Sequence, residues 1–177
     1  MDSIKQRYIK SIPEIKEKLG IKNIMAVPKI TKVVVSAGTG SFKDKKKNDV
    51  VVDRLAKITG QHAVAKGAKK SVASFKIRQG DIVGFMTTLR GDRMYSFLNK
   101  FVNVAIPRMR DFRGLDLKAV DEMGNVTFAV KENTIFPETS DEDLRDVFGL
   151  AITIVTTAKS KKDAMEFLKI IGFPFKK

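Results

Sequence analysis

A long segment of this sequence carries basic side chains and no acidic ones. It runs from Arg54 to Gly80, and its cations are Arg54, Lys57, Lys66, Lys69, Lys70, Lys76 and Arg78. Near its end, Phe75 and Ile77 alternate with the last two of these cations. Lysine and arginine neutralise phosphates, and an aromatic or aliphatic side chain can pack on an exposed base or ribose. The spacing therefore indicates RNA binding. The alternatives are that the charge run is a solvated loop and that Phe75 anchors the loop to the core.

The charge is divided unevenly along the chain. The 177 residues include 34 lysine and arginine against 20 aspartate and glutamate, for a formal net charge of +14 at pH 7. Residues 1–113 hold 25 basic and 9 acidic side chains, whereas residues 114–158 hold 3 and 9. A surface that binds a polyanion needs its cations on one side, so this segregation favours a nucleic-acid partner.

Residues suited to catalysis or metal binding are few. The absence of cysteine excludes disulfides, thiol catalysis and cysteine-based zinc or iron–sulfur sites. We expect His62, the single histidine, at the surface or bonded to backbone. A two-metal nuclease site could use the carboxylates Asp141, Glu142, Asp143 and Asp146. Ser140 before them is typical of a helix N-cap, where the helix dipole stabilises acids. The sequence therefore predicts no metal site and no cofactor.

Hydrophobic periodicity predicts the elements that must position these side chains. Apolar residues at helical spacing indicate helices at 4–19, 50–58, 94–102 and 160–171, and a further short helix begins at Ser140. Runs rich in β-branched residues indicate strands at 29–37, 61–65, 82–89, 126–130 and 151–157. Residues 66–80 lack clean periodicity and are expected to form a long basic loop. We therefore predict one α+β domain over residues 1–177, with a mostly antiparallel sheet, helices packed on one face and the other face free for a partner.

Neither secretion nor membrane insertion is indicated by the sequence. Charges are scattered through the first eight residues, and no uncharged stretch approaches the roughly 20 residues that a membrane helix needs. We therefore expect a cytoplasmic protein with no membrane partner.

Six blocks of residues follow one another along the chain in a recognisable order. They are Gly60–Gln61, Ala68–Gly80, Thr88–Met94, Pro107–Gly114, Ile135–Glu138 and Ile152–Lys159. Together with the closing Phe173-Pro174-Phe175, they make the chain, from about residue 4 onward, similar to one family. It resembles the universal ribosomal protein five of the large subunit, in its bacterial form.

The resemblance implies a protein of the ribosome without catalytic activity. Members of the family bind 5S rRNA in the central protuberance and contact the peptidyl-site tRNA through a basic loop. They also touch a small-subunit protein across the subunit bridge. Large-subunit rRNA and neighbouring ribosomal proteins would be further partners.

Carried over by position, the resemblance assigns residues to each partner. The rRNA-binding residues would be Lys32, Ser36, Gln61, Thr88 and Arg90. Within a tRNA-facing loop at 66–80, the tRNA-binding residues would be Lys69, Lys70, Phe75, Lys76 and Arg78. The subunit bridge would involve Arg108, Arg110, Phe112 and Arg113. Ser36 stands where the family usually has asparagine, and Ser74 stands where it has glycine.

The chemistry of these side chains suits the implied role. Short polar groups such as Ser36, Gln61 and Thr88 can meet ribose 2′-hydroxyls and base edges in a shallow RNA minor groove. Arg90 can bind phosphate in a bidentate manner. The alternative is an RNA-processing enzyme or RNA chaperone that uses the same basic surface.

Overall fold

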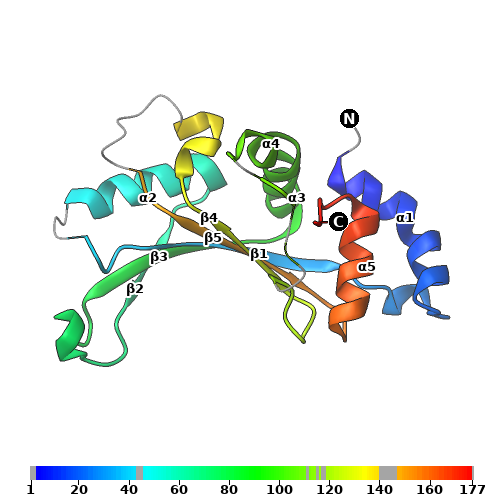
Figure 1. Ribbon diagram of the computed structural model, residues 1–177, viewed down its shortest axis with the longest axis horizontal. Helices are drawn as coiled ribbons and strands as arrows, with labels where there is room; N and C mark the ends of the chain where they lie inside the picture. The colour runs from blue at the N-terminus through cyan, green and yellow to red at the C-terminus, as the bar shows by residue number, and fades with distance from the viewer. Residues whose placement is uncertain are drawn as a thin grey trace. The chain divides into compact units, whose positions relative to one another are not determined.

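The computed structural model describes residues 3–42, 46–110, 112–114, 116, 119–139 and 147–176 (Figure 1). The chain divides into two compact units. The terminal unit comprises residues 1–33, 90–128 and 153–177, and the hairpin unit comprises residues 34–89 and 129–152. Each unit therefore combines segments that are far apart in the sequence.

Five strands form one sheet in the described residues. They are β1 (Ile30–Gly38), β2 (Val64–Gly67), β3 (Ile82–Leu89), β4 (Val126–Val130) and β5 (Leu150–Thr156), in the order β2-β3-β1-β5-β4. β2 pairs with β3 in antiparallel register. Lys29 and Thr157 exchange hydrogen bonds where the chain entering β1 lies beside the chain leaving β5, so these two strands are also antiparallel. The predicted α+β class with a mostly antiparallel sheet is confirmed.

Burial alternates along the strands. In β5, every second residue from Leu150 to Thr156 is buried, and the residues between them are half-buried. In β4, Val126, Phe128 and Val130 are buried, and the two residues between them are exposed. Successive side chains of a strand point to opposite faces, so one face of each strand belongs to the core and the other stays accessible.

The terminal unit contains α1 (Ile4–Lys18), α3 (Gly91–Lys100), α4 (Ile106–Arg108) and α5 (Lys161–Ile171), and α1 packs against both α3 and α5. A π-helical turn, Phe101–Ala105, joins α3 to α4. It precedes Pro107, whose ring would clash with the carbonyl four residues earlier in a regular α-helix. Phe101 is fully buried in this turn, and its ring meets Phe128 of β4 edge-on, with the centroids 5.2 Å apart.

The hairpin unit is built on α2 (Lys46–Thr59), which buries Val51, Leu55 and Ile58. This helix packs against β3 and against the short 3-10 helix η6 (Pro137–Thr139). Asn133, the first residue of η5 (Asn133–Ile135), is fully buried, and its Oδ1 accepts the N–H of Phe148 at 3.2 Å. A buried amide therefore joins two segments of this unit inside its core.

Most elements lie close to their predicted bounds. β3 and β4 begin and end at the predicted residues, and α1, α2 and α5 agree within a few residues. The sequence places a strand at 61–65, whereas β2 lies at Val64–Gly67. The difference arises because the Thr59 hydroxyl accepts the N–H of Gln61 at 3.3 Å and holds this stretch in a turn. The helix expected from Ser140 lies outside the described residues.

Gly84 marks a close approach between β3 and β1. A Cβ atom at this position would lie 2.8 Å from the carbonyl oxygen of Ala37, a distance that real Cβ atoms do not tolerate. Gly38, at the end of β1, has nothing within 4 Å of the equivalent point. A glycine inside a strand commonly marks such an approach of one backbone to another.

We expect Gly84→Ala to lower the free energy of unfolding by about 2 kcal/mol or more, because β3 and β1 must separate locally to admit the methyl group. Gly38→Ala is the matched control and should change that free energy by less than about 0.5 kcal/mol. Urea denaturation followed by circular dichroism measures both variants. An unchanged midpoint for Gly84→Ala would contradict the described packing of the two strands.

Candidate nucleic-acid interface

β2 and β3 form the two sides of a long hairpin arm. Beyond the strands, the N–H of Ala68 donates to the carbonyl of Asp81 at 2.8 Å, and the carbonyl of Ala68 accepts the N–H of Gly80 at 3.0 Å. Figure 1 shows the arm extending away from the helices of the hairpin unit. The segment expected as an irregular loop therefore continues the hairpin, and we call residues 68–81 the hairpin tip.

A tight turn closes the hairpin tip. Val72 and Ile77 exchange two backbone hydrogen bonds, of 2.9 and 3.3 Å, and the 3-10 helix η2 (Ala73–Phe75) lies between them. Lys76 follows with φ 54°, a left-handed conformation that is uncommon for a residue with a Cβ. The turn leaves the side chain of Phe75 74% exposed. Phe75 does not anchor the segment to a core, so the anchoring alternative is wrong.

Two side chains hold the hairpin tip from within. Asp81 Oδ2 accepts the N–H of Arg78 at 2.7 Å, and Ser71 Oγ accepts the N–H of Gln79 at 2.9 Å. Asp81 is the first acid after the acid-free segment, and it fixes backbone geometry. Sequence reasoning missed both residues, although Gly80 followed by an aspartate is a typical turn signal.

The basic side chains of the hairpin tip are exposed to solvent. They are Lys69, Lys70, Lys76 and Arg78, and none of them forms an ion pair with another described residue. Cations without an internal partner are available to phosphate. The structure therefore gathers all five predicted tRNA-binding residues, Phe75 included, on one exposed turn.

Gln61 and Thr88 are brought together at the base of the arm. Gln61 Nε2 donates to the carbonyl of Thr88 at 3.3 Å. The turn that carries Gln61 is held by the buried Thr59, whose hydroxyl also donates to the carbonyl of Leu55 at 2.7 Å. The side chains of Gln61 and Thr88 are only half-buried. The hydrogen bond therefore holds the Gln61 amide in place, and both side chains stay accessible to a partner.

Ser36 lies on β1, the strand beside β3. Its neighbours Val35 and Ala37 are buried, whereas Ser36 is half-buried and belongs to the accessible face. Its hydroxyl donates to the carbonyl of Ala151 at 3.5 Å, which is at the limit for a hydrogen bond. The serine that replaces the family's usual asparagine is thus held only weakly by the sheet.

Lys32 and Arg90 belong to the terminal unit. Lys32 is half-buried on β1. Arg90 is exposed, and as the N-cap residue of α3 it has an extended backbone with φ −139°. Its guanidinium therefore emerges directly after the end of β3.

The basic turn that follows α4 packs against the C-terminal segment. Arg108, Arg110 and Arg113 are exposed, and Phe112 is half-buried. Gly114 has φ 98°, and a Cβ atom there would lie 2.6 Å from the backbone nitrogen of Lys176. Only glycine fits such a position without strain. Close packing at Gly114 therefore fixes one end of the turn while three guanidinium groups stay at the surface.

An ion pair joins α1 to α3 in the terminal unit. Lys5 Nζ lies 2.7 Å from Asp92 Oδ1. The hydrogen bond between them raises the pKa of Lys5 and lowers the pKa of Asp92. Burial raises the pKa of Tyr8 on α1 and of Tyr95 on α3. Lys5 is thus engaged by an internal carboxylate and is less available to phosphate than the cations of the hairpin tip.

The part of the chain that the structure describes offers no candidate metal site. It contains no cluster of three or more histidine, aspartate or glutamate residues that could hold a metal ion, and His62 is exposed. The candidate carboxylates at 141–146 lie outside the described residues. Among the described helices, none is long and apolar enough to cross a membrane.

Comparison with known proteins gives matches over nearly the whole chain. Residues 23–78 match the family described as ribosomal protein L5, and residues 82–175 match the C-terminus of the same ribosomal protein family. The large ribosomal subunit protein uL5 of Halothermothrix orenii is 48% identical over 177 residues, which cover 99% of each chain. Proteins of the same name from Prochlorococcus marinus strain AS9601 and from Carboxydothermus hydrogenoformans are 48% and 46% identical over 177 residues, again with 99% of each chain covered.

Replacing both Ser71 and Asp81 by alanine should loosen the hairpin tip without unfolding the protein. Each replacement removes a side-chain hydrogen bond worth about 1 kcal/mol to the local turn. Together about 2 kcal/mol corresponds to a factor of about 30 in the population of the open tip, so trypsin should cut after Lys76 and Arg78 up to about thirtyfold faster. Mass spectrometry of limited digests measures the rate.

Ser74→Ala is the control for this experiment. It removes a hydroxyl from the same turn, and that hydroxyl has no hydrogen-bond partner among the described residues. It should leave the cleavage rate unchanged. Equal rates for the double variant and the parent protein would show that the two side chains do not hold the tip.

Proposed function

This chain belongs to the ribosomal protein uL5 family, and from that premise we propose that it holds 5S rRNA in the central protuberance of the large ribosomal subunit. As a member of the family, it is a structural constituent of the large subunit and not an enzyme. Its partners include rRNA and other ribosomal proteins. The proposal adds the particular RNA and the residues that contact it.

The hydrogen bond between Gln61 and Thr88 is the observation that carries this proposal. It holds an amide beside a strand end that also bears a hydroxyl, and both side chains remain partly accessible. RNA presents 2′-hydroxyls and base edges in a shallow minor groove, where such groups can donate and accept hydrogen bonds. Ser36 on the neighbouring strand adds a hydroxyl.

Two cations complete the proposed rRNA-binding set. Arg90 offers a guanidinium at the end of β3, and Lys32 offers an ammonium group on β1. We propose that these cations bind phosphate, while Gln61 and Thr88 discriminate between nucleotides.

The hairpin tip is proposed to contact the peptidyl-site tRNA. Phe75 offers an exposed ring for a ribose or base, and four exposed cations flank it in the same turn. The internal bonds of Ser71 and Asp81 form this turn before RNA arrives. A preformed turn loses little conformational entropy on binding, which favours association.

The turn after α4 is proposed to contact a small-subunit protein across the subunit bridge. The half-buried Phe112 is close in sequence to three exposed arginines, Arg108, Arg110 and Arg113. Arginine and aromatic residues are enriched at protein interfaces, where a guanidinium can pair with a carboxylate in two hydrogen bonds.

Gln61→Ala and Thr88→Ala should each weaken 5S rRNA binding by roughly 1–2 kcal/mol per lost contact. Gln79→Ala is the matched control, because it makes the same change on the hairpin tip and should leave the affinity unaltered. Anisotropy of labelled 5S rRNA at constant salt gives the affinities, and urea denaturation checks that each variant folds. Parental affinity in both folded variants would place the 5S rRNA contact elsewhere.

Exchanging the four tip cations for glutamine should separate the two RNA surfaces. Affinity for 5S rRNA should stay within about threefold, or under roughly 0.7 kcal/mol, because these cations lie outside the Gln61–Thr88 site. Ribosomes assembled with the variant should lose peptidyl-site tRNA faster than ribosomes with the parent protein. Filter binding of labelled tRNA measures this retention.

The control for the tip variant removes the same charge elsewhere, by glutamine at Lys159, Lys161, Lys162 and Lys176. It should leave tRNA retention at the parental level. A hundredfold loss of 5S rRNA binding in the folded tip variant would assign the tip to the rRNA surface and contradict the division proposed here.

A further inference from the structure

A short 3-10 helix, η1 (Ile24–Ala26), places two large apolar side chains in solvent. Met25 is 83% exposed and Ile24 is 60% exposed. Among the described large hydrophobic residues, Met25 has the greatest exposed fraction. Scattered apolar residues are ordinary on a surface, but an adjacent pair that is exposed to this extent is a candidate contact.

The turn that carries this pair is fixed by hydrogen bonds. Asn23 Oδ1 accepts the N–H of Met25 at 2.9 Å, and the carbonyl of Asn23 accepts the N–H of Ala26 at 3.0 Å. Val27, which follows directly, is buried and closes the turn with an N–H bond to the carbonyl of Ile24 at 3.2 Å. Both apolar side chains are therefore held in solvent by the fold.

The sequence around η1 has no acidic residue. Between Glu17 and Asp44 the charged residues are Lys18, Lys22, Lys29, Lys32 and Lys43. Lys22 and Lys29 are exposed on either side of the turn. Lys18 is engaged by Glu14, with Nζ and Oε1 2.7 Å apart. The turn thus presents apolar side chains between cations, which complements a polyanion with apolar faces.

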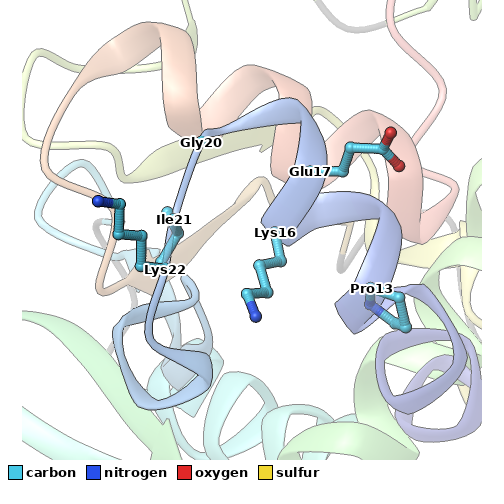
Figure 2. Close-up of a pocket in the computed structure, with 6 residues that line it drawn as sticks. All are labelled: Pro13, Lys16, Glu17, Gly20, Ile21 and Lys22. Atoms are coloured by element: carbon cyan, nitrogen blue, oxygen red, sulfur yellow. The ribbon is translucent and has the colours of Figure 1, made fainter.

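A hollow of about 510 Å³ lies beside this segment. It is lined by Pro13, Lys16, Glu17, Gly20, Ile21 and Lys22. Figure 2 shows the Lys16 side chain extending between α1 and the chain that follows it, while the Glu17 carboxylate points away. The chain leaves the hollow at Lys22 and enters η1 two residues later. Space for a ligand therefore adjoins the apolar pair on its cationic side.

We propose that the η1 turn and its hollow form a further RNA-binding surface, which takes an unstacked base and its flanking phosphates. Met25 and Ile24 pack on the base, and Lys16, Lys22 and Lys29 neutralise the phosphates. Charge complementarity selects this occupant, because three lysines, Lys16, Lys22 and Lys29, face one acid, Glu17, whose carboxylate points away from the hollow. This inference rests on the proposed function in one respect, namely that the bound RNA is ribosomal.

Methionine labelled with ¹³C at its methyl group reports on this surface directly. The probes are an eight-nucleotide oligouridine and 5S rRNA, each added to the full chain. A base that packs on Met25 should shift its methyl resonance through the ring current. Met123 is also exposed, at 73%, and lies in the turn before β4, so its methyl resonance serves as the internal control and should not move.

Two variants with matched controls test the named side chains. Lys22→Gln should raise the RNA concentration for half-maximal shift of the Met25 resonance about threefold, because it removes one phosphate contact. Lys162→Gln, an equally exposed change on α5, should not. Met25→Ser should weaken 5S rRNA binding about fivefold through the loss of stacking, whereas Met123→Ser should leave it unchanged.

A response of the Met25 methyl to either RNA supports the proposal, and no response to both overturns it. If Met25 responds to protein concentration without RNA, the turn is an interface between copies and the proposal is also overturned. Binding of 5S rRNA by the Gln61 and Thr88 variants is measured separately. Failure of this inference is therefore distinguishable from failure of the proposed function.

Discussion

Successive side chains of a β-strand point to opposite faces. In this sheet, the residues that are buried in the core therefore determine which residues are accessible for the proposed rRNA contacts. In β3, Thr87 and Leu89 are buried, so Thr88 between them belongs to the accessible face. In β1, Val35 and Ala37 are buried, so Ser36 is accessible in the same way. A shift of one residue in the pairing would exchange the two faces, burying Thr88 and exposing Leu89. The close approach at Gly84 helps to prevent that shift, since any larger residue at this position would meet the carbonyl of Ala37.

The hairpin arm is stabilised differently from the rest of the sheet, because its strand β2 is exposed at all four residues. Without a core to pack against, its shape depends on backbone pairing and on the side chains of Ser71 and Asp81, which bind backbone N–H groups. Because Asp81 binds a backbone N–H and not a cationic side chain, the neighbouring cations stay available to phosphate. Lys76 adopts a left-handed backbone conformation, which is unfavourable for a residue with a Cβ. The hydrogen bonds of the turn must offset this local free-energy cost.

The sequence predicts the elements that have a buried stripe or alternation and misses the features that depend on single hydrogen bonds. The sequence pattern predicts β3 and α5 because each packs one face on a core. At the predicted start of α5, Ser160 Oγ accepts the N–H of Asp163. β2 gives no alternation, because it is exposed throughout. The contact between Gln61 and Thr88 joins residues 27 positions apart through a carbonyl, which no local pattern encodes. Only the family resemblance pointed to these two residues before the structure placed them together.

Two of the proposed RNA surfaces, the hairpin tip and the site at Gln61 and Thr88, differ in how they depend on salt. Proposed binding at the hairpin tip rests on exposed lysine and arginine side chains, whose attraction to phosphate weakens as counterions compete. At Gln61 and Thr88, half-buried polar groups form hydrogen bonds that ions screen much less. A partner held mainly through the first surface can exchange readily, whereas a partner that also uses the second is retained. This difference suits the proposed roles, in which one RNA stays with the chain and another leaves, and it follows from the placement of the side chains on two distinct kinds of scaffold.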